Sequence, residues 1–172
     1  MKQIYHVGIG AYAVHHSPAV LKTVLGSCVG VLLYHFNSRV GGLAHVYLPN
    51  SKEFKTDFSS AMSERSNFAD VLIPQMINAM GNFGADLSGL QGFVAGGATM
   101  TDSSYNLEVL QIGKRNLQEV RRILNGYNIP FRELDVGGRF GKVITCDLET
   151  GEISLRKVQG FTSVEDIQVQ DF

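Results

Sequence analysis

Residues 28–48, CVGVLLYHFNSRVGGLAHVYL, decide the fold of this chain. Two apolar runs, 28–35 and 40–48, flank the turn-like stretch Phe36-Asn-Ser-Arg39, a pattern typical of a β-hairpin. Neither run alternates apolar with polar residues. We therefore predict that the hairpin lies in the centre of its sheet and is covered on both faces.

The turn of this hairpin sets which side chains share a face. If it closes over Asn37 and Ser38, the numbers of paired residues sum to 75, and His45 lies opposite Gly30. Cys28 then shares the face of His45, one diagonal step away at roughly 7–8 Å between backbones. A loop one residue longer or shorter would place the two side chains on opposite faces.

A cysteine beside a histidine is a candidate nucleophile, because the reactive species is the thiolate and an imidazole can generate it. Gly26 and Ser27 give Cys28 a small, flexible approach in which backbone N–H groups can hold an oxyanion. The competing interpretation is a buried thiol near a core histidine. The residues alone leave both open.

Many such sites have a third residue that orients the histidine. If residues 1–52 supply it here, it cannot be a carboxylate, because the first acidic residue of the chain is Glu53. Thr23 is the nearest hydroxyl that can orient His45, and an ordinary strand threonine is the equally acceptable alternative. Residues 1–52 carry four basic side chains, which we expect to lower the pKa of the Cys28 thiol: Lys2, Lys22, Arg39 and Lys52.

Composition places few further limits on function. The 172 residues are 44 % hydrophobic and 18 % charged, with a net charge of −1, which is ordinary for one globular domain and shows no basic excess for nucleic acid. His6, Gly8 and Gly10 interrupt the first apolar stretch, so we predict neither a signal peptide nor membrane insertion. A cytoplasmic location follows as the default.

Other chemical motifs are weaker. Gly8-Ile-Gly10 nominally fits a dinucleotide fingerprint, but Pro18 breaks the required helix and no acid follows for the ribose, so we expect close backbone packing there and no cofactor. His15, His16 and His35 have no metal-site spacing, and we expect no metal. Cys146 alternates with Ile144 and Leu148, which predicts a core thiol and no disulfide with Cys28.

The remaining elements follow from periodicity. Phe68, Leu72, Met76 and Met80 predict a helix that Pro74 kinks or starts late. We also predict a helix over 113–125, strands over 3–14, 92–95, 131–136, 142–148 and 152–158, and a loop over 49–66. This order indicates an α+β, mixed-sheet protein with a single domain over 1–160 and an acidic tail over 161–172.

At these motifs the chain resembles the bacterial chemoreceptor glutamine deamidase family, CheD. The resemblance is carried by blocks spread over the chain to about residue 158: Thr23-Val-Leu-Gly-Ser-Cys-Val-Gly30, Gly42-Leu-Ala-His-Val-Tyr-Leu-Pro49, Gly96-Gly-Ala-Thr-Met100, Ile112-Gly-Lys-Arg-Asn116, Gly137-Gly-Arg-Phe-Gly141 and Thr150-Gly-Glu-Ile153.

The resemblance implies mixed β-sheets packed as a sandwich and flanked by helices. It implies a Cys-His-Thr catalytic set of Cys28, His45 and Thr23, with Lys22 in the third place if the alignment has no gap. It also implies hydrolysis of glutamine side chains on the helical cytoplasmic domain of a methyl-accepting chemoreceptor, through a thioester on the cysteine. A CheC-type phosphatase is the implied regulator.

Three other functions remain open at this point. A non-catalytic adaptor would bind receptor and phosphatase with an incidental thiol. A receptor methylesterase would use the same thioester chemistry. A thiol redox sensor would need Cys146 as its resolving cysteine, which a core position disfavours.

Overall fold

The hairpin forms the centre of the structure, a computed structural model that describes residues 1–53, 67–99 and 107–158, with the backbone alone over 107–110. Its strands are β4 (Val29–His35) and β5 (Val40–Val46), and every position in both is buried. Val29 pairs with Val46 and Gly30 with His45, which confirms the predicted register. The hairpin is central, because β4 also pairs with β6 and β5 with β2.

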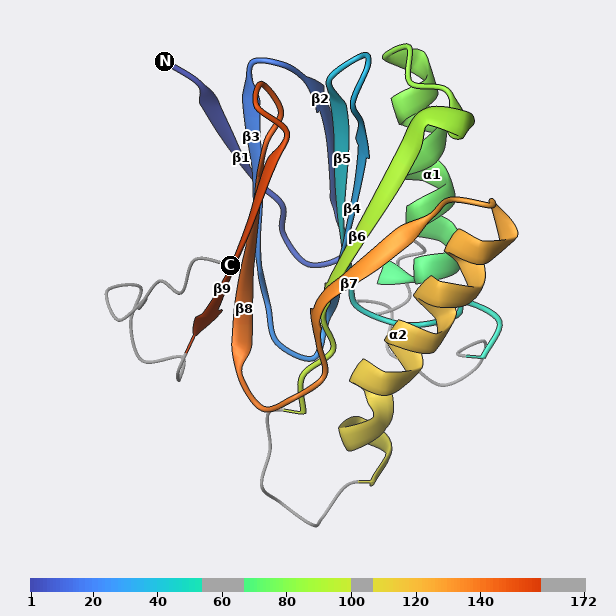
Figure 1. Cartoon of the computed structure of the whole chain (residues 1–172). Coiled ribbons are helices and arrows are strands. Elements are labelled where there is room, and N and C mark those ends of the chain that lie inside the picture. Colours follow the sequence, from blue (N-terminus) through green and yellow to red (C-terminus); the bar gives the residue numbers. More distant parts are fainter. Residues whose placement is uncertain (54–66, 100–106, 159–172) are drawn as a thin grey trace.

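Two mixed sheets are present (Figure 1). The five-stranded sheet has the order β2-β5-β4-β6-β7, and the four-stranded sheet β1-β3-β8-β9. The pairs β1–β3 and β6–β7 are parallel. The other strands are β1 (Gln3–His6), β2 (Tyr12–His16), β3 (Ala19–Leu25), β6 (Leu90–Gly96), β7 (Phe131–Val136), β8 (Gly141–Asp147) and β9 (Glu152–Val158).

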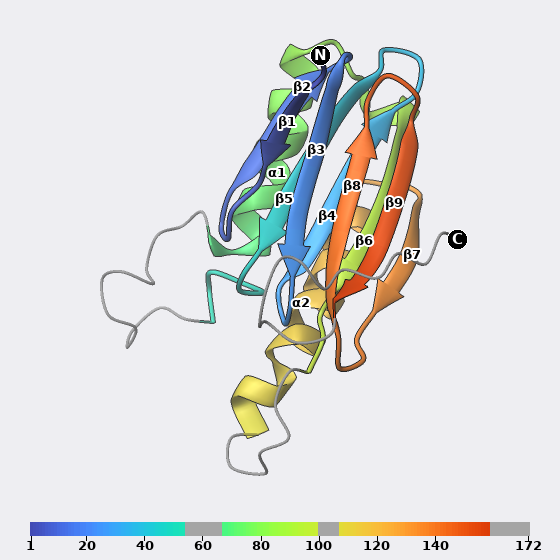
Figure 2. The same ribbon diagram turned by 90° about the vertical axis from the view of Figure 1, so that its left-hand side faces the viewer.

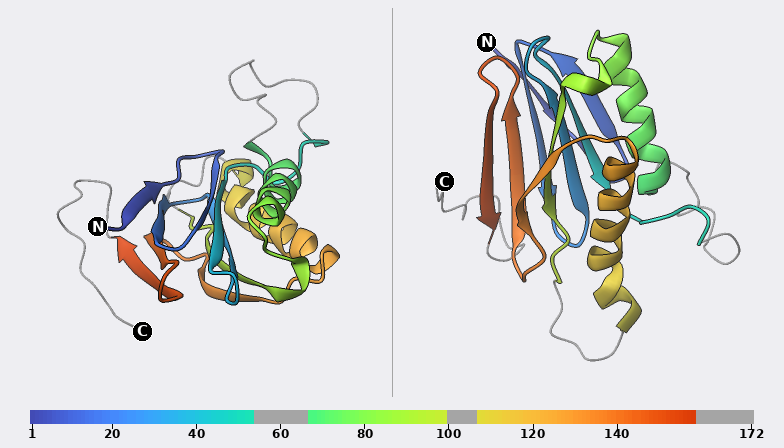
Figure 3. Two further views of the ribbon diagram at one scale, coloured as in Figure 1. Left: turned by 90° about the horizontal axis from the view of Figure 1, so that it is seen from above. Right: turned by 45° about the vertical axis from the view of Figure 1, so that its right-hand side comes forward.

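The sheets pack face to face, and helices α1 (Ala69–Asn82) and α2 (Leu107–Gly126) cover the outer face of the five-stranded sheet (Figure 3). One apolar cluster fills the space between the sheets, and a second lies between the five-stranded sheet and the helices. This arrangement confirms the predicted α+β class and the sandwich of mixed sheets flanked by helices.

The predicted strand over 3–14 is wrong. Residues 3–6 form β1 in one sheet and residues 12–16 form β2 in the other, and the connection crosses between the layers (Figure 2). Gly10 permits the crossing, because its φ is 71° and a Cβ there would overlap the Asn67 carboxamide. The expected close packing is thus found at Gly10, whereas at Gly8 it is wrong, because nothing lies within 4 Å of a Cβ placed there.

Both helices differ from the prediction at their starts. Helix α1 begins at Ala69 and continues through Pro74, so the late start is wrong. Helix α2 begins at Leu107, before the predicted residue 113. The helix needs a glycine at position 113 because the backbone of Gly97 approaches it closely. A Cβ on Gly113 would lie 2.7 Å from the Gly97 carbonyl oxygen.

This close approach gives a stability prediction. Gly113→Ala should lower the free energy of unfolding by about 1–3 kcal/mol, because the new methyl group meets rigid backbone. Gly81→Ala in α1 is the matched control: nothing lies within 4 Å of its Cβ, and it should raise stability by about 0.5–1 kcal/mol. Urea unfolding of both variants checks this, and wild-type stability in Gly113→Ala would contradict it.

The four remaining predicted strands are confirmed. The strands over 92–95, 131–136, 142–148 and 152–158 are found as β6, β7, β8 and β9. Most of the predicted 49–66 loop and the whole 161–172 tail lie outside the described residues.

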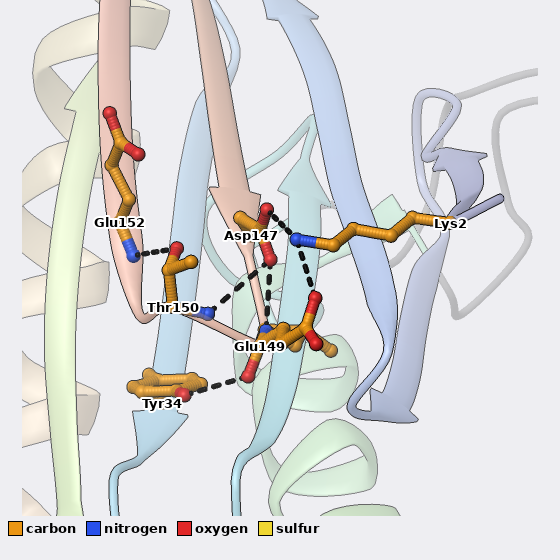
Figure 4. A network of polar contacts seen from close by, with 7 residues as sticks. Lys2, Tyr34, Asp147, Glu149, Thr150 and Glu152 are labelled. Carbon is orange, nitrogen blue, oxygen red and sulfur yellow. Dashed lines mark hydrogen bonds and ion pairs between the residues drawn. The ribbon is translucent and has the colours of Figure 1, made fainter.

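A polar network holds the β8–β9 turn (Figure 4). The Lys2 ammonium lies 2.6 Å from the Asp147 carboxylate and 2.7 Å from that of Glu149, and the Tyr34 hydroxyl donates to the Leu148 carbonyl at 2.9 Å. The turn lies at the end of the sandwich opposite the connection that carries Cys28 (Figure 1). Lys2 therefore acts on the fold far from the candidate site.

Candidate active site

Cys28 lies at a corner between the two sheets. Residues 26–28 connect β3, in the four-stranded sheet, to β4, in the five-stranded sheet, at the end where β5 also finishes (Figure 2). The Cys28 side chain is buried in the cluster between the sheets. Leu25, at the other end of the connection, belongs to the same cluster.

His45 faces the same interior. Its partner Gly30 must face the four-stranded sheet, because a Cβ on Gly30 would lie 2.8 Å from a Leu25 methyl carbon. Opposite residues share a face, so the buried His45 ring also points between the sheets. Cys28, two residues before Gly30, lies on that face, as the hairpin register predicts.

Thr23 connects His45 to the backbone of the β1–β2 connection. Its Oγ1 donates a hydrogen bond to the Val7 carbonyl oxygen at 2.6 Å and lies 2.8 Å from His45 Nδ1. The hydroxyl has one proton, which the Val7 bond uses, so Nδ1 must carry a proton and donate to Oγ1. This assigns His45 the tautomer with a bare lone pair on Nε2.

The Nε2 atom itself is buried, and within the described residues it has no hydrogen-bond partner. An unpartnered buried nitrogen is costly, which makes it a strained or functional feature. Thr23 therefore leaves a basic nitrogen available on the face that carries Cys28.

Lys22, the alternative third residue, is not part of this arrangement. Residues of β3 alternate in burial, and Lys22 lies on the outer side with Val24, which is 45 % exposed. The structure thus brings Thr23 and not Lys22 into contact with His45.

Burial determines the protonation of both groups. It raises the pKa of the Cys28 thiol to about 11, and a hydrogen bond from the cysteine's own backbone N–H acts in the opposite direction. Burial also lowers the pKa of His45, and the Val7 carbonyl opposes that shift. At neutral pH the resting pair is therefore a neutral thiol and a neutral imidazole.

The expectation that nearby basic residues lower the thiol pKa is wrong. Lys2 pairs with carboxylates at the far end of the sandwich, and Lys22 lies on the outer side of β3. Arg39 lies in the β4–β5 turn, at the end of the hairpin away from Cys28. Burial is the largest influence on the Cys28 thiol pKa, and none of the four basic residues, Lys52 included, is among its causes.

The other predicted residues are accounted for structurally. Cys146 is fully buried, which confirms the predicted core thiol, and burial raises its pKa to about 12. His35 accepts a hydrogen bond from the Ser38 backbone N–H at 3.1 Å, within the hairpin turn. The His15 ring stacks on Tyr5 with centroids 3.5 Å apart. No three His, Cys, Asp or Glu side chains gather as a metal site in the described ranges.

Sequence reasoning gave no role to the glycine-containing segment 96–98, which supports the corner. Gly97 N–H donates to the Cys28 carbonyl at 2.8 Å, and Ala98 N–H to the Gly26 carbonyl at 2.9 Å. Gly96 and Gly97 have φ of 102° and 68°, which glycine adopts at little cost. The pair of adjacent glycines was the available signal, whereas nothing in the sequence marked the Val7 carbonyl.

Comparisons with known proteins agree on one family. A family model described as CheD chemotactic sensory transduction matches residues 47–157. The probable chemoreceptor glutamine deamidase CheD of Moorella thermoacetica is 40 % identical over 154 residues, covering 88 % of this chain and 89 % of the relative. The protein of the same name from Clostridium novyi is 37 % identical over 158 residues, covering 91 % and 94 %. No helix in the described part of the chain has the length and apolar character needed to cross a membrane.

Proposed function

The chain belongs to the CheD family, and we propose that it is a protein-glutamine deamidase that converts chemoreceptor glutamine side chains to glutamate through a thioester on Cys28. The observation that supports this most is the buried His45 ring, whose Nδ1 is held by Thr23 and whose Nε2 has no partner among the described residues. A cytoplasmic location and a CheC-type phosphatase as regulator belong to the same proposal.

The first step forms the thioester. As Cys28 Sγ attacks the amide carbon, His45 Nε2 takes the thiol proton, so no thiolate has to exist beforehand. The oxyanion is stabilised by backbone N–H groups of the Gly26–Cys28 corner, each typically contributing about 3–4 kcal/mol. The C–N bond then breaks while the imidazolium returns its proton to nitrogen, and ammonia leaves.

The second step regenerates the thiol. His45 Nε2 takes a proton from water as the water oxygen attacks the thioester carbon. The C–S bond breaks, the proton goes to Sγ, and the substrate leaves as glutamate. Thr23 acts through His45 throughout, because it holds the tautomer whose Nε2 can accept a proton in both steps.

The test is to incubate a purified chemoreceptor cytoplasmic domain with this protein and to locate glutamine-to-glutamate conversions by peptide mass spectrometry. Conversion at defined glutamines supports the proposal. Stable binding without any conversion would favour the adaptor, and release of methanol from a methylated receptor without deamidation would favour the methylesterase.

Replacement of Thr23 tests the tautomer argument. Thr23→Val keeps the shape and removes both hydrogen bonds of the hydroxyl, which leaves His45 Nδ1 with only the Val7 carbonyl 3.5 Å away, so we expect kcat to fall roughly 30-fold as the ring is held less firmly. Thr23→Ser keeps the hydroxyl and should retain most activity. Lys22→Met, on the outer side of β3, is the control that should match wild type. Equal kcat values for Thr23→Val and wild type would exclude this role.

A further inference from the structure

The buried Lys142 has no role in the mechanism above. It is the second residue of β8, it pairs in register with Leu25, and it is only 1 % exposed. Ile144 and Cys146, which follow it on the same face of β8, belong to the apolar cluster between the sheets. A lysine thus occupies a position where the strand pattern otherwise places apolar side chains.

The ammonium group of Lys142 is paired inside the protein. Its Nζ donates to the Gly137 carbonyl oxygen at 2.5 Å and lies 3.4 Å from Asp135 Oδ1, on β7. The other carboxylate oxygen, Asp135 Oδ2, lies 3.4 Å from the Nζ of the half-exposed Lys157. Burying an ammonium costs free energy that a well-packed apolar residue would not, so stability alone gives little reason for a lysine here.

A first series of hydrogen bonds leads from Lys142 to Cys28. Lys142 fixes the Gly137 carbonyl, and the Gly137 N–H donates to the Gly96 carbonyl at 2.8 Å. The next residue, Gly97, donates its N–H to the Cys28 carbonyl at 2.8 Å. Three contacts therefore separate the buried ammonium from the backbone of the proposed nucleophile.

A second series runs beside the first and ends at the start of the same corner. Thr99 N–H donates to the Gly138 carbonyl at 2.8 Å, and Ala98 N–H donates to the Gly26 carbonyl at 2.9 Å. The 137–138 turn thus holds the 96–99 segment at two points, and that segment holds residues 26–28 at two points. Lys142 is the side chain that fixes the turn from inside the sandwich.

We propose that Lys142 is a positioning residue that, through the 137–138 turn and the 96–99 segment, holds the Gly26–Cys28 corner where Cys28 Sγ can transfer its proton to His45 Nε2. This inference rests on the proposed function of the Cys28–His45 pair. The polar contacts of Lys142 are with the Gly137 carbonyl and Asp135, so we assign it a positioning role and not a catalytic one. Its effect is geometric, and small displacements of reacting groups are costly.

The test uses iodoacetamide alkylation of Cys28, which needs the same proton transfer and no receptor. Lys142→Met keeps the length of the side chain and removes the ammonium. We expect its alkylation rate at Cys28 to fall about tenfold, toward the rate of His45→Ala, and its kcat for deamidation to fall about 100-fold with a nearly constant KM. Lys142→Arg, which restores charge and donors, should recover most of both.

Two internal references separate positioning from general loosening. Lys157→Met removes the other lysine beside Asp135 without touching the 137–138 turn, and it should match wild type. Cys146, buried on β8, reports local opening through its own alkylation rate. A Cys28 rate that is unchanged or higher in Lys142→Met would overturn the proposal, and so would a rise in the Cys146 rate that Lys142→Arg leaves uncorrected.

Should Lys142→Met not fold, Asp135→Asn tests the same positioning role, because it keeps the lysine and removes the carboxylate charge that faces it. A smaller fall in the Cys28 rate with an unchanged Cys146 rate supports the proposal, and no fall overturns it. If wild type deamidates no receptor glutamine, the proposed function fails, whereas the alkylation rates still decide the role of Lys142.

Discussion

Cys28→Ala should lower the conversion of receptor glutamine to glutamate by about 10⁴-fold or more, because it removes the only atom that forms the proposed covalent bond. The alanine occupies the same buried corner with less volume, so the fold and receptor binding should persist. Initial rates from peptide mass spectrometry, together with a pull-down on the receptor domain, measure both properties.

Cys146→Ala is the matched control for this loss. Both thiols are buried between the sheets, but Cys146 lies on β8, where its register partners are Leu21 and Ile153. It should retain near wild-type activity apart from a modest loss of stability. Residual turnover by Cys28→Ala within about tenfold of wild type would exclude Cys28 as the nucleophile.

His45→Gln should lower kcat by about 10³-fold, because the side chain then has no nitrogen that can take and return a proton. Cys28 alkylation should slow in the same variant, whereas that of Cys146 should not change. His15→Gln is the control, because His15 stacks on Tyr5 and pairs in register with Gly41, four residues before His45 on β5. Equal Cys28 alkylation rates with and without His45 would contradict an activated thiol.

The pH dependence of His45 follows from the direction of its shift. Burial lowers its pKa, so the imidazole stays neutral and basic at neutral pH and gains a proton only as the pH falls below the ordinary histidine range. We expect kcat/KM to decline on that acidic side and to remain level at higher pH, because the thiol pKa is about 11. The residual activity of His45→Gln should not show this decline of kcat/KM at low pH. If the decline persists in the variant, it arises from the protonation of another group.

The hairpin was the most predictable part of the molecule. A turn over Asn37 and Ser38 fixes side-chain parity along both strands, so the opposition of His45 and Gly30 could be predicted from numbering alone. The first fourteen residues were less predictable. Their apolar character fits one long strand, whereas the chain turns at Gly8–Gly10, where Gly10 has a φ of 71°, and the two halves pair in different sheets.

The candidate residues could be chosen from the sequence, but the electrostatics around them could not be predicted. Cys28 and His45 were selected by chemical type, spacing and the family resemblance, with Thr23 or Lys22 as the third residue, and the structure places Thr23 against His45. The sign of the thiol shift could not be predicted, because burial depends on how the two sheets close over Cys28. The hydrogen bond from Thr23 to the Val7 carbonyl could not be predicted either, since any residue can supply a backbone oxygen.

A trapped acyl-enzyme tests the central claim most directly. Wild-type protein is mixed with a glutamine-bearing peptide from a chemoreceptor cytoplasmic domain, quenched in acid during turnover, and analysed by intact and peptide mass spectrometry. We predict a covalent adduct of enzyme and substrate on the Cys28 peptide, which hydroxylamine removes and Cys28→Ala never forms. Continued deamidation by Cys28→Ala, or an adduct located on Cys146, would contradict the account.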